Sequence, residues 1–502
     1  MSQLRTDAIV DADGTGAPEF TNGLSSQGTI KLDGNYPVGI QNVALGDTAL
    51  DSVQSGGNYN VAIGHGSLTA NTTGDDNSAV GRSSLTSNTT GTENTAIGKS
   101  SAEANTTGDS NTSIGRHSLL SNTTGSSNTA LGTQALNSNT TASSNTAVGY
   151  RAGYSNTTGT LNTFIGETSG DALTVGTRNV SLGQGSLTSD TKGSRSVAVG
   201  QGALNNQNFT SATDAYNTAV GNAAGSQITT GTDNTLIGGA AGDALTTSNA
   251  NVALGKLALS AETTSNGNTA IGAEALKIQN VGGSGDARNT AVGLLAGAAV
   301  TSGIQNTFVG AFAGSNNATG SDNVCIGYDA ICVSSSDGDQ IVIGNDVDSL
   351  AGNTFTFGNN SIGRVSNLFS TNATWSRTSD ERIKKDIQTN TDCGLAFVND
   401  LRTVTYKWKA PSEHPKEFKS YNSLKTEASH TEKMYGFIAQ EVKSALDTHN
   451  ITNFNGWNVA SEDQGSQQGI SYEMFIMPLV KAVQELSAKN DALEARITTL
   501  EG

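Results

Sequence analysis

The 502-residue chain has few bulky and few basic side chains. Aromatic residues make up 5% of it, proline occurs five times, and glycine occurs 60 times. So few bulky groups cannot fill an ordinary globular core, whereas small side chains suit a thin, repetitive structure. The formal net charge of −17 leaves no basic face for phosphate groups, which argues against a nucleic-acid partner.

Signals for disulfides, metals and membranes are also missing. Cys325, Cys332 and Cys393 form neither a metal-ligand nor a disulfide pattern, and an odd count fits assembly in a reducing cytoplasm. The histidines near the C-terminus and the scattered aspartates lack ligand spacing, so we predict neither a metal nor a cofactor. With no long apolar run and no hydrophobic stretch in MSQLRTDAIV, we expect neither a membrane anchor nor export by the general secretory route.

A repeat of 17 residues dominates the centre of the chain. The motif N-x-A-(I/V/L)-G places its glycines at 64, 81, 98, 115, 132, 149, 166, 183, 200, 221, 238, 255, 272, 293, 310, 327 and 344, and an offset copy ends at Gly46. The two steps of 21 residues carry four extra residues each, which we expect to form surface loops. A fixed period predicts a solenoid in which neighbouring turns complete one another's core.

Each repeat predicts one strand and one turn. We expect the Ala-Ile pair before the glycine, such as Ala62 and Ile63, to point its β-branched side chain inward from a strand. A second inward position follows four residues after the glycine, where leucine recurs: Leu68, Leu85, Leu119, Leu136, Leu187 and Leu204. The asparagine four before each glycine predicts a ladder of stacked amides. We interpret the Asn-Thr-Thr triplets as turns, not as glycosylation sites.

The segments N-T-A-I-G and N-V-A-L-G resemble the head repeats of trimeric autotransporter adhesins, which form a β-roll packed as a trimer. Those repeats are somewhat shorter, and those adhesins end in a membrane-anchoring barrel, of which this sequence gives no sign. The resemblance implies a trimeric parallel β-solenoid over residues 42–345. Before it, residues 1–41 are similar to the leading segment of marine phage fibres, which implies a virion-attachment tip. After it, residues 346–378 alternate apolar and polar residues, which predicts a neck of short strands.

The last quarter of the chain differs in character, and half of the 28 lysines and arginines lie in residues 379–502. It contains, in order, SDERIKKDI, GLAFVNDLRTVTYKWK, YGFIAQEV and SYEMFIMPLVKAVQELSAKNDALEARITTLEG. This set resembles the C-terminal intramolecular chaperone of phage endosialidases and other tail fibres, a family of self-cleaving serine peptidases. The resemblance implies a small α+β domain around which three chains fold and which is then released.

Cleavage in that family falls before the serine of S-D-x-R-x-K. The resemblance therefore implies Ser379 as nucleophile, Lys384 as general base and Thr378–Ser379 as the scissile bond, in a reaction that each chain performs once. A serine hydroxyl needs a proton acceptor, and a lysine can serve when burial or nearby positive charge lowers its pKa. From the residues alone, Ser379 before DERIKKDI is also typical of a helix N-cap, and the two roles are compatible.

Two further C-terminal motifs are interpreted as structural. In GFIAQEV, we expect Phe437, Ile438 and Val442 to pack the domain core. Residues 474–501 predict a coiled-coil helix whose apolar seam alternates steps of three and four. The seam residues are Ile476, Leu479, Val483, Leu486, Asn490, Leu493, Ile497 and Leu500. The heptads alone allow two, three or four strands, and the trimer comes from the resemblances.

The sequence therefore predicts a homotrimeric viral tail fibre, made in the host cytoplasm and carried on the virion. Its expected partners are other copies of itself, a tail or baseplate protein bound through the N-terminus, and a host cell-surface receptor, either a glycan or an outer-membrane component. One alternative is a cellular surface adhesin that uses the same chaperone. Another is a glycan-degrading tailspike, although the shaft has no aromatic-lined pair of carboxylates to flank a glycosidic bond.

Overall fold

The computed structural model describes residues 39–283, 285–332, 335–361, 363–368, 376–377, 381–418, 420–428, 432–459 and 467–502. The chain divides into two compact units, one ending at Thr378 and one beginning at Ser379, and each is described by itself. Nearly all of the predicted N-terminal tip, residues 1–41, lies outside the described residues.

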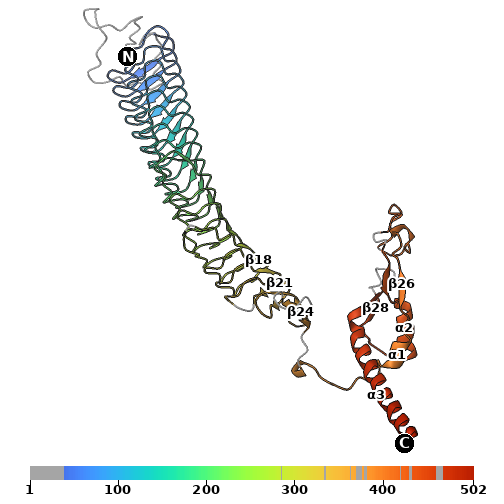
Figure 1. Ribbon diagram of the computed structural model, residues 1–502. Helices are drawn as coiled ribbons and strands as arrows, with labels where there is room; N and C mark the ends of the chain where they lie inside the picture. Colours follow the sequence, from blue (N-terminus) through green and yellow to red (C-terminus); the bar gives the residue numbers. More distant parts are fainter. Residues whose placement is uncertain are drawn as a thin grey trace, which may run out of the picture. The chain divides into compact units, whose positions relative to one another are not determined.

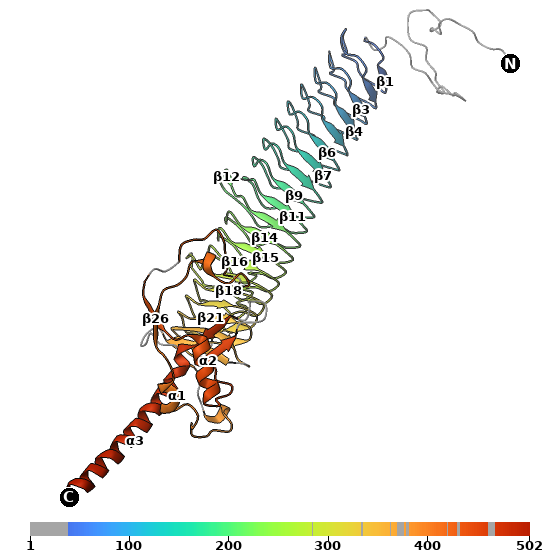
Figure 2. The same ribbon diagram turned by 90° about the vertical axis from the view of Figure 1, so that its right-hand side faces the viewer.

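The first unit is a parallel β-solenoid, which confirms the predicted architecture of a single chain. Figures 1 and 2 show its short strands stacked in chain order along one side. Neighbouring strands pair in register, so that Ala62 lies beside Ala79 and Ile63 beside Val80. The stacked strands are β1 (Val43–Leu45), β2 (Val61–Ile63), β3 (Ser78–Val80), β4 (Thr95–Ile97), β5 (Thr112–Ile114), β6 (Thr129–Leu131), β7 (Thr146–Val148), β8 (Thr163–Ile165), β9 (Val180–Leu182), β11 (Val197–Val199), β13 (Thr218–Val220), β14 (Thr235–Ile237), β15 (Val252–Leu254), β16 (Thr269–Ile271), β17 (Thr290–Val292), β18 (Thr307–Val309), β19 (Val324–Ile326) and β21 (Ile341–Gly344).

Side chains alternate across each strand. In β2, Ala62 is fully buried and Ile63 is 37% exposed, and in β4 the corresponding Ile97 is 41% exposed. The expectation that the β-branched residue points inward is therefore wrong. Successive side chains of a strand point to opposite faces, so only the alanine enters the core and the larger residue lies outside.

Large and small inward side chains compensate one another between coils. The leucines four residues after the repeat glycine are buried, as predicted. Where phenylalanine takes the inward strand position at Phe164, glycine takes the leucine position in its own coil (Gly170) and in the preceding one (Gly153). A methyl group at Gly153 would lie 2.5 Å from Phe164 Cδ2. Glycines likewise take the leucine position around Leu236 and around Phe308. A close-packed interior has no room for a large side chain at the strand position and a leucine beside it.

The predicted asparagine ladder is confirmed. Asn77 donates from Nδ2 to Oδ1 of Asn60 at 3.1 Å, and its backbone N–H donates to the same oxygen at 3.0 Å. Nδ2 also donates to the Gly91 carbonyl at 2.9 Å, and Asn94 repeats the pattern one coil later. Each buried amide thus satisfies backbone groups of the following coil and bonds to the side-chain amide of the preceding one.

A second ladder runs through the Asn-Thr-Thr triplets. Asn88 Nδ2 donates to Asn71 Oδ1 at 2.9 Å, and Asn105 Nδ2 donates to Asn88 Oδ1 at 2.8 Å. These side chains are buried, so they are closed to glycosylation. The turn interpretation missed their role in the core, although their period of 17 residues was visible in the sequence.

Two buried carboxylates, Asp190 and Glu262, occupy the same position of the coil beyond the end of the second ladder, each one coil ahead of a 21-residue step. Gln207 Nε2 donates to Asp190 Oδ2 at 2.7 Å, and Gln279 Nε2 donates to Glu262 Oε2 at 3.0 Å. Burial raises the pKa of Asp190 above its usual range. Burial acts the same way on Glu262, but hydrogen bonds, including those from Ser265 and Gln279, outweigh it and lower the pKa of Glu262 overall.

Shorter strands lie beside the main stack and after it. Within the first 21-residue step, β12 (Thr213–Asp214) pairs with β10 (Gly193–Ser194), so the inserted loop is partly strand. β20 (Ala330–Ile331) pairs with β22 (Val347–Asp348). The solenoid is followed by an antiparallel hairpin of β23 (Thr354–Asn359) and β24 (Gly363–Leu368), with β25 (Ser376–Arg377) paired to β24.

Two of the cysteines lie together inside the solenoid. Cys325, in β19, and Cys332, directly after β20, are buried free cysteines whose Sγ atoms lie 2.6 Å apart. The contact with Cys332, together with burial, raises the pKa of Cys325. The sequence had no pairing signal for them because only the path of the coil brings them together.

The second unit is a small α+β arrangement ending in a long helix, as predicted. Its elements are η1 (Glu381–Ile383), α1 (Leu395–Asn399), β26 (Val404–Tyr406), η2 (Pro411–Glu413), β27 (Met434–Gly436), α2 (Ala439–Thr448), β28 (Trp457–Val459), β29 (Gln468–Ile470), η4 (Tyr472–Phe475) and α3 (Ile476–Glu501). Two antiparallel pairs form, β26 with β27 and β28 with β29.

Candidate functional site

The predicted cleavage site is only partly described. Thr378 and Ser379 lie outside the described residues, so the pairing of Ser379 with Lys384 stays a prediction. Lys384 follows η1, and its backbone N–H donates to the Glu381 carbonyl at 3.1 Å. Residues 381–392 are all exposed in the single chain. A proton-accepting lysine needs a less solvated setting, which this segment does not have in one copy of the chain.

A small apolar core holds the second unit together. Phe397 of α1, Val442 of α2 and Phe475 of η4 are buried in one cluster. Phe437 packs against that cluster, as predicted, but Ile438 is 37% exposed. The expectation that Ile438 fills the core is wrong, because Ile438 precedes the first turn of α2, whose buried face begins at Val442.

Glu485 connects the long helix to α1. The backbone N–H of Leu395, in the first turn of α1, donates to Glu485 Oε2 at 2.8 Å. This hydrogen bond lowers the pKa of Glu485. A carboxylate at a helix N-terminus satisfies a free backbone donor and fixes the start of the helix.

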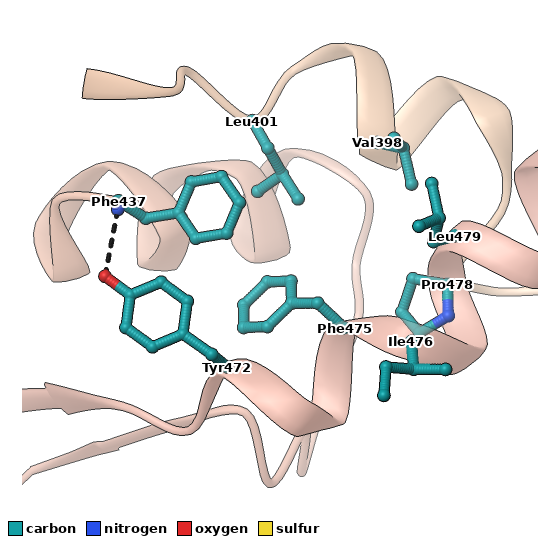
Figure 3. A pocket seen from close by; sticks show the side chains of 8 residues that line it. All are labelled: Val398, Leu401, Phe437, Tyr472, Phe475, Ile476, Pro478 and Leu479. Carbon is teal, nitrogen blue, oxygen red and sulfur yellow. Dashed lines mark hydrogen bonds between the residues drawn. The ribbon is translucent and has the colours of Figure 1, made fainter. Parts of the chain in front are cut away.

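An apolar pocket of about 210 Å³ lies where α3 begins. Figure 3 shows Phe437 and Tyr472 side by side at its edge, with Leu401, Phe475 and Leu479 among the other lining residues. The two aromatic rings stack with centroids 5.8 Å apart, and the Phe437 N–H donates to the Tyr472 hydroxyl at 3.1 Å. Among the lining residues only Tyr472 has a polar side-chain group, and its hydroxyl accepts the Phe437 N–H, so the pocket fits an apolar contact.

Paired charges cover the surface between α1 and α2. Arg402 forms an ion pair with Glu441, and this hydrogen bond lowers the pKa of Glu441. His449 Nε2 lies 2.6 Å from Asp400 Oδ2. Sequence reasoning assigned His449 no chemistry and missed this contact, which joins residues 49 positions apart. With both carboxylates engaged by neighbouring side chains, the arrangement is structural.

Apolar side chains of the last helix are exposed in the single chain. Along α3, Leu479 is 55% exposed, Leu486 56% and Leu493 55%. The other apolar members of the predicted seam, Ile476, Val483, Ile497 and Leu500, are exposed as well. A helix in water does not normally leave such a stripe open, since contiguous apolar patches mark interaction surfaces.

A second exposed stripe, here called the apolar row, follows the solenoid sheet. Its members precede the repeat glycines, stack in register and are 37–47% exposed. They are Leu45, Ile63, Ile97, Leu131, Leu182, Ile237, Leu254, Val309, Ile326 and Ile343. Each unit of the chain thus presents an apolar surface without an internal partner.

The described residues also bear on membrane spans and metal sites. None of the helices there combines the length and the apolar character that a bilayer span requires. Nor does that part of the chain hold a cluster of three or more His, Cys, Asp or Glu side chains placed to bind a metal ion.

Comparison with known proteins gives a match within the second unit. Residues 379–451 match the family model described as chaperone of endosialidase, a family of self-cleaving intramolecular chaperone domains. No curated protein and no solved structure matches the chain. The chain therefore combines a β-solenoid with a C-terminal segment that matches the model of this chaperone family.

Proposed function

We propose that the protein is a homotrimeric viral tail fibre that attaches the virion to its host and that its C-terminal chaperone cuts itself off after assembly. The observation that carries the proposal is the pair of exposed apolar stripes, one on α3 and one on the solenoid. Both run lengthwise along their own unit, and parallel copies of the chain would cover both. The matching chaperone family supports the same assembly.

Cleavage follows from the residues of the family motif. Ser379 Oγ attacks the carbonyl carbon of Thr378 while Lys384 Nζ accepts the hydroxyl proton. The peptide C–N bond breaks, the proton passes to the departing amine of Ser379, and an ester joins the two segments. Water then hydrolyses the ester, which leaves a carboxylate on Thr378 and restores the hydroxyl of Ser379. Each chain cuts once, and the shaft that remains has no peptidase activity.

Assembly supplies a reason for the timing of cleavage. The segment that carries Lys384 is exposed in one copy, and neighbouring copies would desolvate it. A lysine accepts a proton from serine readily only in such a setting. Cleavage would therefore wait for the complete trimer. We propose that the mature shaft binds the host receptor and that its N-terminus attaches to the tail or baseplate. The mature protein would then be located on the virion.

The test is the intact mass and the native mass of the purified protein beside three variants. The parent should yield fragments 1–378 and 379–502, whereas Ser379→Ala and Lys384→Ala should stay whole and remain trimeric. Lys407→Ala is the matched control, since it removes an exposed lysine outside the cleavage motif, and should cleave like the parent. A parent that stays whole contradicts self-cleavage. A monomeric native mass contradicts the trimer.

A further inference from the structure

Two rows of exposed residues border the apolar row of the solenoid. The leading row consists of the residues five before each repeat glycine, and the trailing row consists of those directly after it. Both rows are held in place from coil to coil by the backbone. Glu93 N–H of the leading row donates to the Asp75 carbonyl at 3.0 Å, and Ser100 N–H donates to the carbonyl of trailing-row Arg82 at 2.9 Å.

The two rows carry opposite charges at the same level of the solenoid. In one coil, Asp76 belongs to the leading row and Arg82 to the trailing row. In the next coil, Glu93 belongs to the leading row and Lys99 to the trailing row. All four side chains are exposed. None of them forms an ion pair within the described chain, where Glu93 only accepts a hydrogen bond from Ser110 Oγ at 2.9 Å. Two separate margins of one sheet thus hold complementary, unmatched charges.

The complementarity continues along the shaft. Arg178 of the leading row and Glu167 of the trailing row are one coil apart, as are Asp233 and Lys256. Across all repeats, no leading-row charge has a trailing-row charge of the same sign at its own level or one coil away. Like charges placed opposite one another destabilise strand pairs and interfaces, so this pattern fits rows that meet.

Apolar side chains fill the same rows elsewhere. Tyr59, Leu161 and Tyr216 of the leading row, and Tyr150, Leu294 and Tyr328 of the trailing row, are 47–55% exposed. With the apolar row between them, the face has an apolar centre and margins of aromatic and charged residues. This is the composition of a protein interface and not of a solvated sheet face.

We infer that this face binds a second copy of the chain, with the leading row of one copy against the trailing row of the next at the same level. The inference rests on the proposed trimer and specifies its contact. In a closed ring of parallel copies, each chain offers one margin to each neighbour. Asp76 then meets Arg82 of the neighbouring copy, and Glu93 meets its Lys99.

Engineered cysteines test the contact. In one chain, residues 93 and 99 flank β4 (Thr95–Ile97) at its two ends and are at most about 20 Å apart, whereas a disulfide needs Cα atoms roughly 4–7 Å apart. Glutathione disulfide would take the two electrons and two protons of each thiol pair and leave two molecules of glutathione. Glu93→Cys/Lys99→Cys should therefore form a covalent trimer on a non-reducing gel. Either single variant, and Glu93→Cys/Thr107→Cys on another exposed side of the coil, should migrate as monomers.

The outcomes separate the interface from the trimer itself. A trimeric native mass without the cross-link overturns the row contact and leaves the proposed function standing. A monomeric parent overturns both. Should the cysteine variant misfold, the charge series decides: Glu93→Lys should lower the temperature at which the trimer dissociates, and Glu93→Lys/Lys99→Glu should restore it. An equal loss in the single and the double variant contradicts the inference.

Discussion

Replacing Asn111 by alanine should open the solenoid locally, because Asn111 is a buried rung of the first ladder. Its Nδ2 donates to Asn94 Oδ1 at 3.1 Å and to the Gly125 carbonyl at 2.8 Å. Its Oδ1 accepts from the Asn128 backbone N–H at 3.0 Å and from Asn128 Nδ2 at 3.1 Å. Alanine removes all four hydrogen bonds at once.

The cost depends on which groups lose their last partner. The Gly125 carbonyl keeps a bond from Asn122, and Asn128 Nδ2 keeps one to Ala142. The Asn128 backbone N–H has no other acceptor among the described residues and stays buried. An orphaned buried donor costs about 1–3 kcal/mol, and the three other lost bonds cost about 0.5–1.5 kcal/mol each, so we expect a loss of roughly 2.5–7.5 kcal/mol.

Hydrogen–deuterium exchange measured by mass spectrometry checks this expectation on the intact chain. A loss of about 3 kcal/mol speeds exchange through local opening by roughly 150-fold, so peptides containing Asn128 should lose protection. Thr107→Ala is the control, since Thr107 is exposed, and a surface change of this kind should shift stability by less than about 0.5 kcal/mol. Parental exchange in a folded Asn111→Ala protein would refute the reasoning.

Other perturbations probe the core, the buried carboxylates and the last helix. Gly297→Ala would place a methyl group 2.8 Å from Phe308 on a backbone with φ of +59°, so calorimetry should show a loss of about 2–4 kcal/mol. The pKa of Asp190 is raised, so its contribution to stability is lost as pH rises through its folded-state pKa; the pKa of Glu262 is lowered, so its contribution is lost as pH falls through its own. We therefore expect melting curves across the acidic range to differ between the two variants. Asp190→Asn should remove a fall in stability with rising pH, and Glu262→Gln should remove a rise in stability with rising pH. Changes of the same sign in both variants would contradict this. Leu486→Glu puts a charge in the exposed stripe of α3, so native mass spectrometry should show loss of the trimer, and the uncut chain should accumulate.

Much of the solenoid was predictable because its 17-residue period is visible in the sequence. An asparagine every 17 residues must stack on its counterparts, and the ladder at Asn60, Asn77 and Asn94 follows. The prediction from the sequence failed at the choice of strand face, because either of two neighbouring residues could point into the core. Ile63 was placed inside the core, although the alternation of strand side chains puts Ala62 there and leaves Ile63 for an external contact.

The candidate site was predictable to a lesser degree. The ordered motifs from Ser379 onward identified the chaperone family, which the family match confirms, and the apolar spacing of α3 was visible. The ion pair of Arg402 with Glu441 and the contact of His449 with Asp400 were not, because each joins residues far apart along the chain. Whether Ser379 and Lys384 act together stays a prediction.

The sequence by itself determined the period, the strand positions, the first ladder and the seam of the last helix, since each depends on local spacing alone. Only the tertiary structure decided how coils share space. In the tertiary structure, Phe164 packs against the glycines of two coils, the Asn71 and Asn88 amides form a second ladder, and Cys325 lies beside Cys332. These outcomes depend on contacts between coils, where close packing and the satisfaction of buried polar groups choose among side-chain placements that one repeat leaves open.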